Sequence, residues 1–246
     1  MTHYKATITS QRYYAISKRL VDLTLSLIGL LVLSPLLAAI ALLIKLDSPG
    51  PVLFIQKRIG MGGRPFRIIK FRTMEHRLND AKHRAFMRAF IRGEIGSAQT
   101  QTGECSPEDS DLQNQPQPST EGPTGDKQAI FKPFQKSQVT RIGRILRKTS
   151  LDELPQVLNV LAGNMSLVGP RPNVPWEVEE YQDWHRERLA VLPGITGLAQ
   201  VNGRSAIDFG TIVRYDVEYV RSRNLWLDLR ILAQTVFQVL IGHGAH

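Results

Sequence analysis

The chain has 246 residues, a formal net charge of +9 and a sequence pI near 9.9. This length fits one domain, or one domain with a membrane anchor, and the positive charge predicts an anionic partner such as nucleic acid, anionic lipid or a phosphorylated substrate. The single cysteine, Cys105, excludes an intramolecular disulfide framework. The six histidines lack the spacing of a zinc site, so the sequence gives no indication of structural zinc.

An apolar run of 22 residues, 23–44, is long enough to cross the roughly 30 Å core of a bilayer. Ser34 and Pro35 lie at its centre, where proline removes a helical hydrogen bond. Basic residues flank the run on both sides, whereas a spanning helix normally carries its positive excess on one side. Both features favour a helix that enters the membrane, bends and leaves on the same face. Kinked spanning helices also contain proline, so the sequence leaves the two topologies equally open.

Short strands and a basic helix are predicted next. Residues 51–58 and 65–72 have the pattern of two strands, joined by the glycine-rich turn 60–63. Residues 75–92 have apolar positions at helical spacing.

Residues 93–128 differ in composition from the rest of the chain. They contain seven acidic residues and one lysine, and Ile95 and Leu112 are their only large aliphatic side chains. The remainder of the chain therefore carries a net charge of +15. Such a segment cannot bury enough apolar surface to offset its chain entropy, so we expect a disordered insert without a catalytic role.

The second half of the chain alternates helical patterns with proline- and glycine-rich loops. A basic helix follows Val139, and a strand-like run from Met165 leads into a loop stiffened by Pro170 and Pro172. A short strand is predicted at 198–201 within the glycine-punctuated loop 193–205. Further helices are predicted at 151–161, 176–191, 208–221 and 225–241.

Asp152 and Glu153 are the first candidates for chemistry, because they follow a run of cations at a predicted helix start. Two carboxylates beside a helix N-terminus and arginines can hold a divalent cation and a phosphate together, and a carboxylate there can attack phosphorus. The structural alternative is a helix cap, in which Ser150 and Glu153 form a capping box. A third possibility places the N-cap at Asp152 or beyond, because Pro155 belongs in a first helical turn.

Four cations are candidates for binding phosphate. Lys70 and Arg72 alternate with apolar residues on a predicted strand, which equally fits an exposed polar face. Arg171 lies between two prolines, whose stiffness would reduce the entropy lost on gripping a phosphate. Arg204 ends a glycine-rich loop, a setting that turn chemistry alone could also explain.

Five motifs in order resemble the bacterial sugar transferases, the monotopic polyprenyl-phosphate phosphoglycosyl transferases. They are the Ser–Pro-interrupted apolar run, Lys-Phe-Arg-Thr-Met at 70–74, Leu-Asp-Glu-Leu-Pro-Gln at 151–156, Ser-Leu-Val-Gly-Pro-Arg-Pro at 166–172 and the glycine-rich motif at 193–204. The similarity runs from about Lys18 to the C-terminus and is interrupted by the insert, which is longer than expected for a minimal member. No multi-span region precedes the apolar run, so we expect a catalytic module alone.

The resemblance implies a two-step reaction. Asp152 would attack the sugar-bearing phosphorus of a UDP-sugar and release UMP, and undecaprenyl phosphate would then take the phosphosugar. Mg²⁺ would assist beside Asp152 and Glu153, while Lys70, Arg171 and Arg204 would bind or neutralise phosphate. Ser34 and Pro35 would turn the re-entrant helix. The product would initiate exopolysaccharide, capsule, O-antigen or glycoprotein glycan assembly.

We therefore expect an α+β fold, mostly helical with short strands, a re-entrant membrane helix and amphipathic interfacial helices. Residues 1–46 would form the membrane segment and 47–246 a catalytic domain at the cytoplasmic face of a bacterial inner membrane. The expected partners are a UDP-sugar, undecaprenyl phosphate and the bilayer, without nucleic acid; the sequence does not specify an oligomeric state. The alternatives are a basic membrane-tethered binding protein and a once-spanning scaffold, in which Asp152 and Glu153 only cap a helix.

Overall fold

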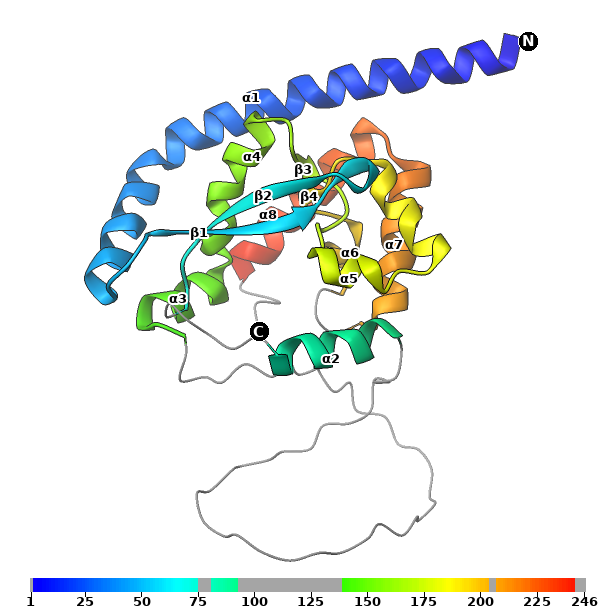
Figure 1. The fold of residues 1–246 in the computed structure, drawn as a ribbon. Coiled ribbons are helices and arrows are strands. Elements are labelled where there is room, and N and C mark those ends of the chain that lie inside the picture. The colour runs from blue at the N-terminus through cyan, green and yellow to red at the C-terminus, as the bar shows by residue number, and fades with distance from the viewer. Residues whose placement is uncertain (1, 75–80, 93–138, 204–206, 242–246) are drawn as a thin grey trace, which may run out of the picture.

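The structure is a computed structural model that describes residues 2–74, 81–92, 139–203 and 207–241. Side chains are described except at 2–12, 81–86 and 240–241. One long helix, α1 (Thr2–Asp47), lies along one side of a domain of short helices and strands (Figure 1). The described part of the chain is mostly helical with a few short strands, which fits the predicted α+β class. The predicted insert 93–128 lies outside the described residues.

Helix α1 continues without interruption through Pro35, and it curves so that its C-terminal part turns towards α3 (Arg141–Thr149) (Figure 1). Proline has no N–H, so the carbonyl oxygen of Leu31 loses its regular helical donor. The hydroxyl of Ser34 donates to this oxygen instead, at 2.8 Å. The Ser–Pro pair therefore permits a curved helix rather than two separate arms, and the helix extends well beyond the apolar run.

Helix α1 contacts the domain on both sides of its apolar centre. Near its N-terminal side, Arg19 donates to the carbonyl oxygens of Val160 (2.7 Å) and Leu161 (3.2 Å), and Asp22 accepts from the N–H of Leu167 (3.2 Å). On its C-terminal side, buried Ile40 and Ile44 pack with Phe71 and Leu146, and Asp47 accepts from the N–H of Ile142 (3.0 Å). Between these contacts, large apolar side chains face outwards: Leu27, Ile28, Leu31, Val32 and Leu36.

The predicted hairpin is confirmed. Strands β1 (Leu53–Ile59) and β2 (Pro65–Phe71) pair antiparallel, and the turn between them contains the short 3₁₀ segment η1 (Met61–Gly63). Gly62 and Gly63 have φ values of 66° and 76°, which L side chains rarely adopt. The turn chemistry of the glycine-rich segment therefore explains the hairpin.

A second sheet forms between distant segments. Strand β3 (Ser166–Val168) pairs parallel with β4 (Gly194–Thr196). A Cβ at Gly194 would lie 2.1 Å from the backbone nitrogen of Gly169, so only glycine permits this close approach. The predicted strand at 198–201 is wrong: these residues belong to helix α6 (Leu198–Asn202), and the strand lies just before it. Leu198 and Val201, one helical turn apart, pack against the same core cluster.

Two predicted helices are divided. Residues 151–161 form the 3₁₀ segment η3 (Leu151–Gln156) followed by α4 (Val157–Leu161). Residues 176–191 form α5 (Pro175–Glu179) and the 3₁₀ segment η4 (Asp183–Ala190), separated near Gln182. There the N–H of Gln182 donates to Nδ1 of His185 at 3.2 Å, which starts a new turn.

The other predicted helices are present as α2 (Ala81–Arg92), α3, α7 (Phe209–Ser222) and α8 (Leu225–Ile241). Residues 75–80 of the predicted helix 75–92 lie outside the described residues. Within the part of the chain that the structure describes, buried apolar side chains form four clusters. One of them, between α2, α5, η4 and α7, contains Phe90, Tyr181, Phe209 and Val213. Another lies between β2, α4 and β3 and contains Ile68, Val160 and Met165. This second cluster lies under the strand and the 3₁₀ segment that carry the candidate site.

Candidate active site

The predicted carboxylate pair lies on η3, directly after a sharp turn. Ser150 ends α3 with φ 57°, the only positive φ of a non-glycine residue among those described. Its side chain makes no capping hydrogen bond to η3, and the side chain of Glu153 binds Lys70 and Arg171, so the alternative of a capping box is not found. Because Ser150 has the left-handed conformation, the chain changes direction there and presents Asp152 and Glu153 towards β2.

Glu153 binds two of the predicted cations. Its Oε1 lies 2.7 Å from Nζ of Lys70 and 2.8 Å from Nη2 of Arg171, and its Oε2 accepts from Nη1 of Arg171 at 3.4 Å. Burial alone would raise the pKa of Glu153, but Arg171 and Lys70 hold it far below its ordinary range. Burial, and then the neighbouring Arg171, lowers the pKa of Lys70. Three segments far apart in the sequence thus meet at one carboxylate.

Asp152 has a different environment from its neighbour. Among the described residues, its carboxylate makes no hydrogen bond or ion pair, although Lys70, Arg171 and Arg147 lie close enough to act on it electrostatically. Burial, reinforced by the charge of Glu153, raises the pKa of Asp152 despite these three cations. Asp152 is therefore a carboxylate in a cationic setting that remains available to an incoming ligand.

The backbone around the pair is held by residues that the motif pattern did not single out. Asn159 of α4 donates to the carbonyl oxygen of Arg67 (2.7 Å) and accepts from the N–H of Ile69 (3.0 Å), which fixes η3 and α4 against β2. Gly143 allows α3 to press on Thr73, because a Cβ there would lie 2.1 Å from the carbonyl oxygen of Thr73. These contacts span up to 92 residues of sequence, so periodicity could not reveal them.

Arg147 is a further cation of the site. Its Nε donates to Oγ1 of Thr73 at 2.9 Å, which fixes the end of α3 beside Asp152. Burial lowers the pKa of Arg147, and the charge of Asp152 opposes this effect. The two cations that bind Glu153 also line a small cavity. Its lining consists of Lys70 and Arg171 together with Arg58, Ile68, Gln156, Pro172 and Gly194.

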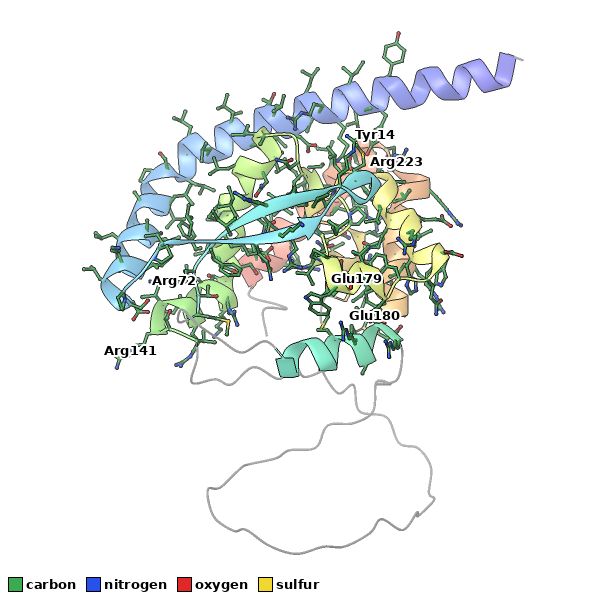
Figure 2. The ribbon with its side chains drawn as sticks, in the orientation of Figure 1. Tyr14, Arg72, Arg141, Glu179, Glu180 and Arg223 are labelled. Atoms are coloured by element: carbon green, nitrogen blue, oxygen red, sulfur yellow. The ribbon has the colours of Figure 1, made fainter. Side chains whose placement is uncertain are left out.

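Arg72 is not brought into this cluster. Its guanidinium donates to the carbonyl oxygens of Pro49 (2.6 Å) and Ser48 (2.8 Å), and it is buried beside the C-terminal end of α1 (Figure 2). The ladder of β1 and β2 ends at Leu53 and Phe71, so Arg72 lies past the strand and turns towards the loop after α1. We therefore leave Arg72 out of the proposed site. Arg204 lies outside the described residues.

Metal binding can be judged from the donors present. Among the described residues, no group of three or more His, Cys, Asp or Glu side chains could hold a metal ion. Mg²⁺, however, is commonly held by one or two carboxylates while substrate phosphates and waters complete its shell. Asp152, which has no protein partner in the described part of the chain, fits that mode with Glu153 next to it.

Comparison with known proteins gives matches over most of the chain. A family model described as "Bacterial sugar transferase" matches residues 13–242. The chain is 37% identical to a UDP-glucose:undecaprenyl-phosphate glucose-1-phosphate transferase of Escherichia coli over 93% of this chain and 41% of that protein. It is 36% identical to the galactosyl transferase CpsE of Streptococcus agalactiae, over 98% of this chain and 47% of the relative.

A shorter relative is covered more fully. The UDP-glucose:undecaprenyl-phosphate glucose-1-phosphate transferase of Caulobacter vibrioides is 36% identical over 93% of this chain and 72% of its own length. The chain thus spans less than half of the two longer relatives and most of the shorter one.

Proposed function

The chain belongs to the bacterial sugar transferase family, and from this premise we propose that it transfers a sugar 1-phosphate from a UDP-sugar to undecaprenyl phosphate and releases UMP. The observation that carries this proposal is the carboxylate of Asp152, which makes no hydrogen bond or ion pair to another described residue and lies beside the ion cluster of Glu153, Lys70 and Arg171. The relatives' names include glucose, galactose and N-acetylgalactosamine donors. We therefore assign the donor only as a UDP-sugar.

The proposed reaction has two displacements at one phosphorus. An oxygen of Asp152 forms a bond to the sugar-bearing phosphorus while the bond from that phosphorus to the bridging oxygen breaks, and UMP leaves with the electron pair. A phosphate oxygen of undecaprenyl phosphate then attacks the same phosphorus, and the bond to Asp152 breaks. The polyprenyl diphosphate sugar leaves and the carboxylate is restored, so charge and atoms balance.

The neighbouring cations make an attack of one anion on another feasible. Lys70 and Arg171 share the single charge of Glu153, so the three groups together keep a net positive charge beside Asp152. Arg147 adds a further positive charge on the side of α3. Preorganised charges of this kind stabilise the extra negative charge that develops on the phosphate oxygens. We propose Arg204 as an additional phosphate contact on the basis of its motif.

We also propose that Mg²⁺ binds with the substrate, held by Asp152 and Glu153 together with the diphosphate. When bound, it would neutralise phosphate charge and orient the leaving group. Glu153 already binds Lys70 and Arg171, whereas Asp152 has no protein partner among the described residues. Asp152 is therefore the carboxylate that can contribute to the metal without first breaking an ion pair.

We propose a re-entrant topology at the cytoplasmic face of the inner membrane, and the contacts of α1 support its re-entrant part. The described helix carries a stretch, Tyr13–Asp47, that is long and apolar enough to cross a membrane. Asp22 and Asp47, on either side of its apolar centre, both bind the same domain. A helix that crossed the bilayer between them would have to leave one of these contacts on the far side. The exposed apolar side chains between them would face the lipid.

Interfacial helices are part of the same proposal. Helix α8 exposes a group of large apolar side chains, Trp226, Leu229, Val236, Phe237 and Val239. Exposed apolar side chains grouped in this way are expected to be covered by another apolar surface. A lipid surface beside α1 would cover them. The phosphate of undecaprenyl phosphate lies at the membrane surface. This placement of α8 would therefore bring that phosphate to the depth of the candidate site.

The proposed function is tested by incubating the membrane-inserted protein with undecaprenyl phosphate and a panel of UDP-sugars, with UMP release as the signal. Turnover of at least one UDP-sugar that depends on undecaprenyl phosphate is the expected result. A folded protein that binds the membrane but turns over none of the UDP-sugars would favour the alternative of a membrane-tethered binding or scaffold protein.

A further inference from the structure

A buried ion pair lies behind the candidate site. Arg188 of η4 and Asp216 of α7 are 3% and 1% exposed, and Nη2 of Arg188 lies 2.5 Å from Oδ2 of Asp216. Although burial alone would lower the pKa of Arg188, the charge of Asp216 raises it above its ordinary value. Replacing a buried ion pair by apolar residues is often neutral or stabilising, so stability alone does not account for the pair.

Arg188 uses its remaining donors on two further groups. Nη1 donates to the hydroxyl of Tyr181 at 2.8 Å, and Nη2 donates to the backbone carbonyl oxygen of Arg171 at 3.1 Å. One planar guanidinium therefore joins Asp216, Tyr181 and the backbone of the residue whose side chain binds Glu153. Only arginine offers several donors in a fixed plane for such a junction.

The loop 170–173 is held at every carbonyl. The carbonyl oxygens of its four residues accept from the N–H of Gly194 (2.9 Å), Nη2 of Arg188 (3.1 Å), Nη1 of Arg58 (3.2 Å) and the N–H of Ile59 (2.9 Å), in chain order. The bond from Arg188 is the one at Arg171 itself. It fixes the backbone of a residue whose side chain is half exposed and would otherwise have freedom to move.

We propose that Arg188, held in place by Asp216, is the positioning residue for Arg171. It fixes the backbone of Arg171 so that the Arg171 guanidinium meets both oxygens of Glu153 and stays beside Asp152. The effect of Arg188 on catalysis rests on the proposed function, whereas its effect on the geometry of Arg171 does not.

The first test uses Arg188→Lys, which keeps the positive charge beside Asp216 but has a single nitrogen for three partners. We expect UMP release to fall by about tenfold to a hundredfold, because a displacement of about 1 Å in a catalytic group has effects of that size. The matched control is Arg221→Gln. It breaks a second ion pair between η4 and α7, Arg221 to Glu187 at 2.7 Å, which is exposed. UMP release by this control should stay near the wild-type rate.

A double-mutant comparison separates positioning from general stability. In the Arg171→Ala background, Arg188→Lys should cost little further activity, because the group that it positions is absent. An equal loss in both backgrounds would show that Arg188 acts elsewhere and would overturn the proposal. If Arg188→Lys fails to fold, the pair Arg188→Met with Asp216→Asn leaves no buried unpaired charge and replaces it in the same comparison.

A spectroscopic readout decides the proposal even if no UDP-sugar is turned over. Nitrogen-15 NMR of the wild type, with the Arg171 signals assigned from Arg171→Lys, should show hindered rotation of the Arg171 guanidinium. This rotation should become fast in Arg188→Lys and stay hindered in Arg221→Gln. Unchanged hindrance in Arg188→Lys would overturn the positioning role. If the wild type shows no turnover but its hindered rotation becomes fast in Arg188→Lys, the proposed function is removed and the positioning role is kept.

Discussion

Asp152 and Glu153 are adjacent in the chain, yet the pKa values of their carboxyl groups are shifted in opposite directions. Glu153 is bound by two cations, whereas Asp152 is partly buried and makes no hydrogen bond or ion pair within the described residues. A carboxylate whose charge is poorly stabilised shares its electrons more readily than one that is held by two cations. The two groups are therefore suited to different roles, Asp152 to attack and Glu153 to holding the cations in place.

The first prediction concerns this nucleophile. With a UDP-sugar but no lipid acceptor, the wild type should release about one UMP per active enzyme as a burst, because the covalent intermediate cannot be discharged. The peptide that contains Asp152 should gain the mass of a phosphosugar. Asp152→Asn keeps the size of the side chain but lacks the anionic nucleophile, so both signals should disappear and steady-state turnover should fall on the order of a thousandfold or more.

A matched control for this prediction is Asp183→Asn, which changes an exposed acid at the start of η4. This variant should retain both the burst and the mass gain. Near-native turnover by a folded Asp152→Asn protein would instead indicate direct transfer without a covalent intermediate, and Asp152 would not be the nucleophile.

The second prediction concerns Glu153. Glu153→Gln removes the charge that Lys70 and Arg171 share, so the two cations repel each other and Arg171 loses its fixed partner. We expect UMP release to fall about a hundredfold, the scale expected for a misplaced catalytic group. Glu180→Gln is a suitable control, because Glu180 pairs with Arg88 and Arg92 on the surface, and such pairs contribute little. Wild-type turnover by Glu153→Gln would show that the ion cluster is not needed for the reaction.

The local chemistry of the sequence predicted the hairpin and the last two helices well. The glycine-rich turn at 60–63 determines the connection between β1 and β2, and the helical patterns of α7 and α8 are long enough to be unambiguous. Short segments were harder to predict. Leu198 and Val201 fit either an apolar strand or one helical turn, and the observed helix α6 results from their packing against a shared core cluster.

The candidate site was only partly predictable, for a related reason. Lys70 and Arg72 are equivalent in the strand pattern, but the ladder ends between them, so one reaches Glu153 and the other binds the loop after α1. Asn159 and Arg188 hold the site through bonds to distant backbone atoms. A single polar residue in a helical pattern carries no sign of such a partner. The motifs therefore indicated the candidate reacting groups and left out the residues that hold them in place.

A third prediction concerns the dependence of stability on pH. His185 is buried, its Nδ1 accepts from the N–H of Gln182, and burial followed by the nearby Arg188 lowers its pKa below 6.5. Below about pH 6.5 the unfolded chain therefore binds a proton that the folded protein resists. The contribution of His185 to the free energy of unfolding should therefore be largest above that pH and should decrease as the pH falls through it, whereas buried Asp216, whose pKa is raised to about 6, contributes in the opposite direction.

This prediction is checked by thermal unfolding between about pH 5 and pH 8. In His185→Asn, which keeps an acceptor for Gln182, the decrease on the acid side should be smaller than in the wild type. An equally steep decrease in both proteins would assign the pH dependence to other groups.

The last prediction concerns the topology of α1. Both ends of its apolar centre bind the same domain, so the N-terminal end of the helix and the hairpin turn should face the cytoplasm together. After Cys105→Ser, single cysteines are introduced as Lys5→Cys and Met61→Cys. In intact cells, both should resist a membrane-impermeant thiol reagent, and both should react after the cells are opened. A cysteine placed in a known periplasmic protein serves as the positive control for labelling.

Labelling of only one of the two positions in intact cells would establish a spanning helix. The contacts of Asp22 and Asp47 with one domain could then not exist together in the membrane, and the re-entrant topology would be wrong.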